Sequence, residues 1–79
     1  MKFNNIYRYK SSVGIFFIRY NSSIQRWDLG VEDVVFGNYH TAEAAAGDVY
    51  CHATGCYEWD ILDGVMQNVP SDLSEWKTS

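Results

Sequence analysis

The fold is decided by residues 38–60, which read Asn38-Tyr-His-Thr-Ala-Glu-Ala-Ala-Ala-Gly-Asp-Val-Tyr-Cys-His-Ala-Thr-Gly-Cys-Tyr-Glu-Trp-Asp60. Apolar residues recur here at helical spacing and form a single stripe, which consists of Ala42, Ala45, Ala46, Val49, Tyr50 and Ala53. Thr41 can cap the start of the helix with its hydroxyl, and Gly55 is the natural residue to end it. The stretch therefore predicts one Ala-rich helix over residues 41–55, with small side chains that allow close approach to a sheet.

Three runs before this helix have the composition of β-strands. Residues 13–20 are almost continuously β-branched or aromatic, residues 24–31 alternate apolar with polar, and residues 34–39 form a third short run. Turn-forming residues separate the runs, which predicts an antiparallel meander of three or four strands, with residues 2–10 as the fourth. Both faces of the first run are apolar, and we assign Ile15 and Phe17 to the helix side. The predicted core is Ile15, Phe17, Trp27, Leu29, Val31, Phe36, Ala45, Val49 and Ala53.

The chain after the helix is rich in aromatic residues. Residues 56–64 have helical spacing over one or two turns, and Pro70 and Ser71 introduce a last short turn with Ser71 as its N-cap. Large apolar side chains could fold this tail back onto the domain, namely Trp59, Leu62, Leu73 and Trp76. The predicted fold class is α+β: a single domain over residues 1–79, with the antiparallel meander, one Ala-rich helix on one face and a short C-terminal aromatic tail.

Length and composition limit the class of protein. A chain of 79 residues makes one domain and buries only about 60% of its unfolded surface, so its aromatic content of 16% matters for stability. We expect neither a signal peptide nor a membrane-spanning helix, because no apolar run is long enough. Two cysteines without a secretory signal predict a cytoplasmic protein.

Charge is divided unevenly along the chain. Residues 1–26 contain five basic residues and no acid, whereas residues 27–79 contain all ten acids and only Lys77, which together give the net charge of −4. This asymmetry predicts electrostatic steering of a partner, although a small domain also needs charge for solubility.

Catalytic and metal chemistry are not expected. His40, Cys51, His52 and Cys56 are potential ligands, but their spacing matches no paired metal-binding motif. A disulfide between Cys51 and Cys56 is geometrically conceivable, while a buried Cys56 and a surface thiol at Cys51 agree better with a reducing compartment. No residues are positioned as nucleophile and base, and no glycine-rich phosphate loop is present. We therefore predict no enzyme activity, no metal and no cofactor.

Two binding functions remain. Arg8, Lys10, Arg19 and Arg26 lie near Tyr7, Tyr9 and Tyr20, an interleaving that can bind single-stranded nucleic acid, but the acidic net charge disfavours it. Protein binding fits better, because aromatic residues on a short acidic segment are typical interface anchors. The predicted partner-binding residues are Tyr57, Glu58, Trp59, Asp60 and Asp63. The alternative for Trp59 and Trp76 is that both complete the core.

Two resemblances bear on function. The run from Tyr39 to Gly55, continuing to Glu58-Trp59-Asp60, and the ending Val69 to Trp76 resemble a group of very short bacterial and mobile-element proteins of unassigned function. This resemblance covers roughly residues 24–76 and implies a compact sheet-plus-helix domain without known chemistry. In size and acidity the chain is also similar, in general character, to phage-encoded anti-CRISPR inhibitors.

The function expected from the sequence is a non-catalytic protein-binding module. Its most concrete form is a phage or mobile-element inhibitor whose acidic aromatic surface occupies a basic site on a larger protein or protein–nucleic-acid complex. The alternatives are a small bacterial accessory or adaptor protein, and a redox or metal-linked protein that uses its cysteines and histidines. Neither direct nucleic-acid binding nor membrane association is expected.

Overall fold

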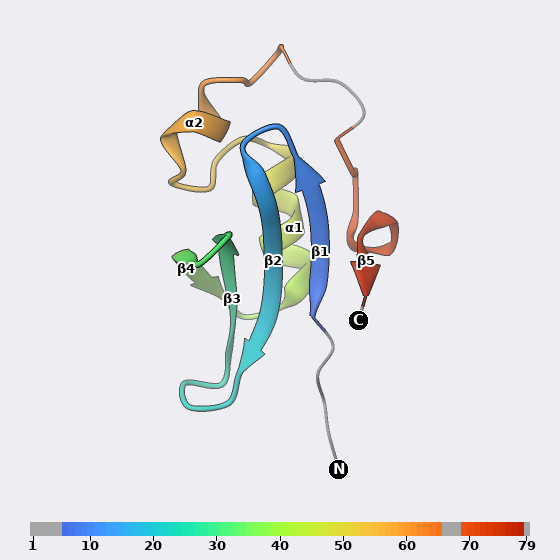
Figure 1. Cartoon of the computed structure of the whole chain (residues 1–79). Helices are drawn as coiled ribbons and strands as arrows, with labels where there is room; N and C mark the ends of the chain where they lie inside the picture. The colour runs from blue at the N-terminus through green and yellow to red at the C-terminus, as the bar shows by residue number, and fades with distance from the viewer. Residues whose placement is uncertain (1–5, 66–68, 79) are drawn as a thin grey trace.

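The described part of the chain forms a five-stranded antiparallel sheet with one main helix packed on one face (Figure 1). The computed structural model describes residues 6–65 and 69–78. The strands are β1 (Tyr7–Ser11), β2 (Gly14–Asn21), β3 (Arg26–Val31), β4 (Val34–Tyr39) and β5 (Lys77–Thr78), in the spatial order β4-β3-β2-β1-β5. The first four form the predicted meander, and β5 returns from the end of the chain to pair with β1. The α+β class is confirmed.

The main helix, α1 (Ala42–Tyr50), begins where the sequence predicts. The Ala44 N–H donates to the Thr41 hydroxyl at 3.0 Å, so Thr41 is the N-cap. The predicted end at Gly55 is wrong, because the helix stops after Tyr50 and His52 takes the left-handed conformation, with φ +56°. The Ala53 N–H donates to the Asp48 carbonyl at 2.9 Å and the His52 N–H to the Val49 carbonyl at 3.2 Å, which is a Schellman ending.

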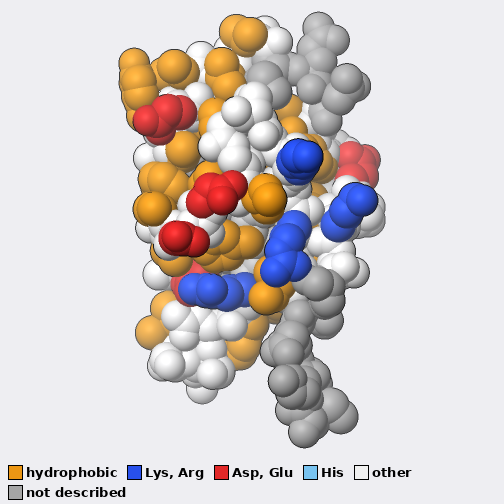
Figure 2. Space-filling view, in the orientation of Figure 1, with side chains coloured by type: hydrophobic (Ala, Val, Ile, Leu, Met, Phe, Trp, Pro, Cys, Tyr) orange, Lys and Arg blue, Asp and Glu red, His pale blue; other side chains and the backbone are white. Residues whose placement is uncertain are grey.

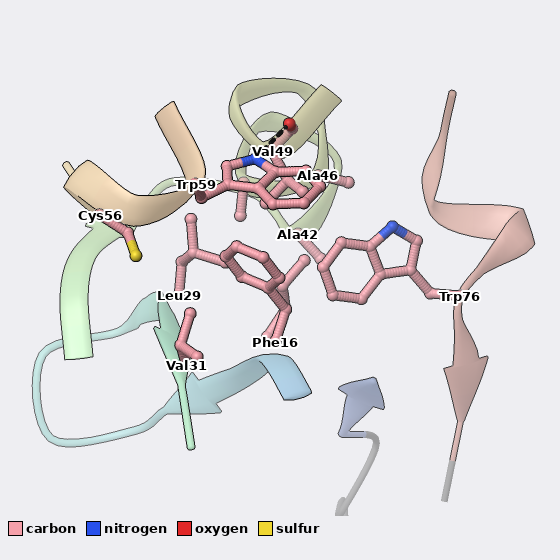
Figure 3. Packing of buried hydrophobic residues seen from close by; sticks show 11 residues of the cluster. Phe16, Leu29, Val31, Ala42, Ala46, Val49, Cys56, Trp59 and Trp76 are labelled. Carbon is pink, nitrogen blue, oxygen red and sulfur yellow. Dashed lines mark hydrogen bonds between the residues drawn. The ribbon is translucent and has the colours of Figure 1, made fainter. Parts of the chain in front are cut away.

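The core lies between the sheet and α1 (Figure 3). Leu29, Val31, Ala45 and Val49 are buried as predicted, and Trp27 and Phe36 are half-buried against them. Ala53 is exposed instead, because the chain has already left the helix at His52.

The predicted orientation of β2 is wrong. Phe16 and Ile18 point into the core and are fully buried, whereas Ile15 lies on the opposite face with 40% of its surface exposed. Alternation could not identify the inner face, because both faces of β2 are apolar. Phe17 is only 9% exposed although it lies outside the core cluster.

Gly30 on β3 explains how Phe17 is buried on the face without a helix. The two residues pair across the strands. A Cβ atom built on Gly30 would lie 2.5 Å from the Phe17 ring and 2.2 Å from the Val34 carbonyl oxygen. The pairing of β3 with β4 shifts register at the same place, between Leu29 and Gly30, which brings the β4 backbone close. The missing side chain therefore leaves the space that the Phe17 ring fills.

The C-terminal segment closes the core as predicted. A short 3₁₀ helix, η1 (Leu73–Glu75), precedes β5, and its N-cap is Asp72, whose carboxylate accepts from the Ser74 N–H at 2.9 Å. The predicted cap, Ser71, instead bonds to Glu75 through its N–H and hydroxyl. Trp76 is buried against Tyr9 and Phe16, so the interpretation of Trp76 as a core residue is confirmed.

In the described part of the chain, no helix has the length and apolar character needed to cross a membrane.

Candidate protein-binding surface

A short helix, α2 (Tyr57–Asp60), follows α1, and the side chain of its residue Trp59 anchors it to the core. The Trp59 side chain is fully buried, and its indole N–H donates to the Val49 carbonyl at 2.9 Å (Figure 3). One side of the indole stacks on the His52 imidazole, with ring centroids 4.4 Å apart, and Phe16 meets it edge-on at 5.1 Å. Trp59 is therefore a core residue that anchors α2 to the end of α1.

Asp60 fixes the loop that leads into α2. Its carboxylate accepts hydrogen bonds from the Thr54 N–H at 3.0 Å, the Thr54 hydroxyl at 2.9 Å and the Gly55 N–H at 2.9 Å. The Thr54 hydroxyl oxygen in turn accepts from the Cys56 N–H at 3.0 Å. These bonds satisfy backbone donors that precede the short helix. The carboxylate of Asp60 is thus occupied within the protein.

The other three predicted partner-binding residues are exposed. Tyr57 is 72% exposed, Glu58 is exposed beside it, and the Asp63 side chain is 75% exposed. Of the five predicted residues, the structure therefore places Tyr57, Glu58 and Asp63 on the surface, whereas Trp59 and Asp60 have structural contacts. The Asp63 carboxylate also lies 3.9 Å from Nδ1 of the buried His52 imidazole.

Two further apolar residues of the same segment are exposed. Ile61 is 55% exposed and Val65 is 68% exposed, and they follow Tyr57 at intervals of four residues. The Ile61 N–H donates to the Tyr57 carbonyl at 3.1 Å, so these two residues lie on successive turns. Neither Ile61 nor Val65 belongs to the predicted partner-binding set, although their spacing of four residues is visible in the sequence. We call Tyr57, Glu58, Ile61, Asp63 and Val65 the α2 surface.

The α2 surface combines exposed apolar area with negative charge. Hydrophobic and acidic side chains lie together at the end of the molecule that carries α2 (Figure 2). No basic residue belongs to the segment from Tyr57 to Val65. Large exposed apolar side chains are common in interfaces, and the carboxylates would select a basic surface over an acidic one.

The cysteines and histidines differ in their environments. Cys51 is exposed and Cys56 is buried, and both are free thiols. His40 lies beside Arg26, with 3.2 Å between the imidazole Nε2 and a guanidinium nitrogen, while His52 is packed on Trp59. Within residues 6–65 and 69–78, no three His, Cys, Asp or Glu side chains are grouped in a way that could hold a metal ion.

The basic residues of the N-terminal strands lie on the face of the sheet opposite to α1. Lys and Arg side chains gather over β1 and β2, with hydrophobic side chains between them (Figure 2). Tyr7 and Tyr9, which the sequence places next to these cations, point instead toward the core and contact Trp27 and Trp59. The aromatic and basic residues of β1 therefore face opposite sides, and their interleaving in sequence does not form one surface.

Comparison with known proteins adds no family: no family model, no curated protein sequence and no solved structure matches this chain.

Proposed function

We propose that the protein is a non-catalytic binding module and that the α2 surface is its contact with a larger partner. The observation that carries this proposal is the exposure of Tyr57, Ile61 and Val65 on a segment whose only charges are negative. Covering apolar side chains of this size with a partner removes apolar surface from water, which is favourable. The acids indicate that the partner presents basic side chains around an apolar patch.

The anchoring of α2 supports this proposal. Trp59 and Asp60 hold the segment rigidly through the core and the Thr54 loop, so the exposed side chains are preorganised before a partner binds. A rigid surface loses less conformational entropy on association than a flexible one. The most concrete partner is a host complex that handles nucleic acid, whose basic site this surface would occupy as an inhibitor.

Charge reversal tests the surface without disturbing the fold. Proteins captured from lysate by the tagged wild type should be lost with the double variant Glu58→Lys and Asp63→Lys. Asp60 is left intact because its carboxylate is needed internally. The matched control, Asp33→Lys with Glu43→Lys, makes the same charge change at exposed positions outside the α2 surface and should retain the partner. Equal capture by both double variants would refute the proposal.

Competition distinguishes an inhibitor from an adaptor. If the partner's basic site normally holds nucleic acid, an added duplex oligonucleotide should displace the wild-type protein from the captured complex. Displacement by the oligonucleotide and loss of capture in the reversed variant together support the inhibitor. A complex that resists the oligonucleotide but still depends on Glu58 and Asp63 supports an accessory or adaptor function instead.

A further inference from the structure

The face of the sheet opposite to α1 carries two adjoining hollows. The first has a volume of about 250 Å³ and is lined by Ile6, Arg8, Ile15, Phe17, Arg19 and Glu32. The second has a volume of about 420 Å³ and is lined by Arg8, Tyr9, Lys10, Ile15, Glu75 and Lys77. Because Arg8 and Ile15 line both, the two hollows adjoin, and we refer to them together as the depression across β2, β1 and β5.

Positive charge is concentrated around this depression. Arg8 pairs directly with Lys77 across β1 and β5, so two like charges lie opposite each other on the same face. Lys10 pairs with Ile15 of β2, and Arg8 also pairs with Phe17. Cations gathered on one face attract a negatively charged ligand to it. The arrangement of Arg8, Lys10 and Lys77 therefore favours a negatively charged ligand.

The floor of the depression is apolar, which restricts the ligand further. Ile15 is 40% exposed where the hollows meet, and Phe17 lies beneath the Arg19 guanidinium, which is 5.0 Å from the ring centroid. A ligand that matches both the rim and the floor carries an apolar group between anionic groups. A polypeptide segment with Asp or Glu on either side of a Leu or similar residue has this composition.

Single-stranded nucleic acid fits the same face less well. Binding of that kind depends on exposed aromatic rings on which the bases stack. Phe17 is 9% exposed and covered by Arg19, and Tyr7 and Tyr9 make their ring contacts on the core side.

We propose that this face, with Arg8, Lys10, Ile15, Arg19 and Lys77, is a second binding surface whose ligand is an acidic polypeptide segment with an apolar side chain between its carboxylates. The apolar side chain lies over Ile15, and the carboxylates contact the cations on the rim. This surface is distinct from the α2 surface and of opposite charge, so the protein can contact a basic partner and an acidic one at the same time.

Fluorescence anisotropy with a defined peptide tests the charge component. The probe is a short fluorescein-labelled peptide with one Leu flanked by Glu on both sides, titrated with the full chain at low and at physiological salt. The double variant Lys10→Ala and Lys77→Ala should bind the peptide about tenfold more weakly. Each exposed ion pair accounts for part of that loss in affinity. The control Arg26→Ala removes a cation that bonds to Asn38 and lines neither hollow, and should bind as the wild type does.

A double-mutant cycle tests the apolar component. Replacing the peptide's Leu by Ser, or Ile15 by Ser in the protein, should each weaken binding several-fold, and the second change should add little once the first is made. Additive losses would show that Ile15 does not contact the Leu and would overturn the assignment. Equal binding by the charge variant and the Arg26→Ala control would also overturn it.

Two further outcomes would replace the proposed ligand by another. If an oligothymidylate binds more tightly than the peptide and displaces it, the face binds nucleic acid and the proposal is wrong. If sedimentation equilibrium shows a dimer that the Lys10→Ala and Lys77→Ala variant abolishes, a second copy of this chain occupies the face. Peptide binding by a monomer that the oligonucleotide leaves undisturbed supports the proposal.

Discussion

The Trp59 indole N–H donates to the Val49 carbonyl oxygen at 2.9 Å, which joins α2 to the last turn of α1. Val49 lies in the last turn of α1, and its carbonyl also accepts from the His52 N–H at 3.2 Å. The Trp59 bond therefore gives this carbonyl a second donor and satisfies a buried side-chain donor. Trp59 connects the candidate binding surface to the core through this bond and through its stacking on His52.

Replacing Trp59 by a residue without the indole N–H should destabilise the protein by more than the loss of buried ring area alone. Trp59→Phe should lower the free energy of unfolding by about 1–3 kcal/mol beyond the loss of buried area, because the bond lies in the interior. The matched control is Trp76→Phe, since the Trp76 indole N–H is buried without a protein partner among the described residues. Urea unfolding followed by far-UV circular dichroism measures both, and a larger loss for Trp76→Phe would contradict this explanation.

The left-handed conformation of His52 predicts an unusual order of substitutions. At φ +56° a Cβ atom is unfavourable, so His52→Ala should be less stable than His52→Gly by about 1 kcal/mol. The neighbouring residue Cys51 has φ −86° and should show the opposite order, with Cys51→Ala more stable than Cys51→Gly. Thermal unfolding of the four variants checks both orders, and equal stability of the two His52 variants would exclude backbone strain at this position.

Two glycines should respond to alanine in opposite directions. Gly30→Ala places a Cβ atom 2.2 Å from the Val34 carbonyl oxygen and against the Phe17 ring, so it should destabilise the protein by about 3 kcal/mol or more. Gly47 lies within α1 and its Cβ would meet no atom within 4 Å. Gly47→Ala should therefore stabilise the protein by about 0.5–1 kcal/mol. Denaturant midpoints report both changes, and a tolerated Gly30→Ala would disprove the packing of Phe17 on Gly30.

The acids of the α2 segment should separate into structural and exposed ones. Asp60→Ala removes the acceptor of the Thr54 and Gly55 donors and should cost about 1–3 kcal/mol of stability. Glu58→Ala should change stability by less than about 0.5 kcal/mol, because Glu58 is exposed. Unfolding curves of both variants provide the measurement. Similar losses of stability in the two variants would mean that the hydrogen bonds of Asp60 do not stabilise the fold.

Stability should fall at alkaline pH because of Tyr39. Burial, together with a 2.7 Å hydrogen bond to the Asp48 carboxylate, raises the pKa of Tyr39 above its ordinary value of 10.0. The folded state then keeps the proton when the unfolded state releases it, so the contribution is present below pH 10.0 and is lost as the pH rises beyond it. Tyr39→Phe should be less stable at neutral pH and should lose less stability between about pH 9 and about pH 11.

Unfolding free energies of the wild type and Tyr39→Phe, measured across that pH range, show whether Tyr39 causes the alkaline loss of stability. Tyr9, whose pKa is raised by burial, contributes in the same direction, so Tyr39→Phe reduces the alkaline loss without removing it. An alkaline decline that is the same in the variant and in the wild type would show that Tyr39 is not responsible.

The sequence was sufficient to predict an element correctly where one physical signal dominated. Thr41 was recognisable as a cap because its side chain suits that role in isolation, and the meander followed from the turns between apolar runs. The inner face of β2 could not be chosen, since Phe16 and Phe17 are equally apolar and only the Gly30 gap on the partner strand tells them apart. The end of α1 was missed because His52 takes a conformation that glycine usually adopts, supported by its tertiary stacking on Trp59.

The candidate surface was predictable only in part, because tertiary contacts decide which of its residues are exposed. Tyr57, Glu58 and Asp63 lie on the surface, whereas Trp59 and Asp60 are occupied by partners distant from them along the chain. Composition identified the segment, but only packing separates its anchors from its exposed residues.

The pairing of β1 with β5 has a consequence for the response of the protein to mechanical force. Tyr7 is the partner of Thr78 in an antiparallel pair, so the first and last residues of the sheet lie side by side at one end of β1 and β5 (Figure 1). Tension applied between these two residues pulls along the direction of the interstrand hydrogen bonds, and it breaks them one after another. The sheet should therefore open like a zipper under a small load, beginning with β5 and withdrawing Trp76 from the core, however stable the protein is against heat.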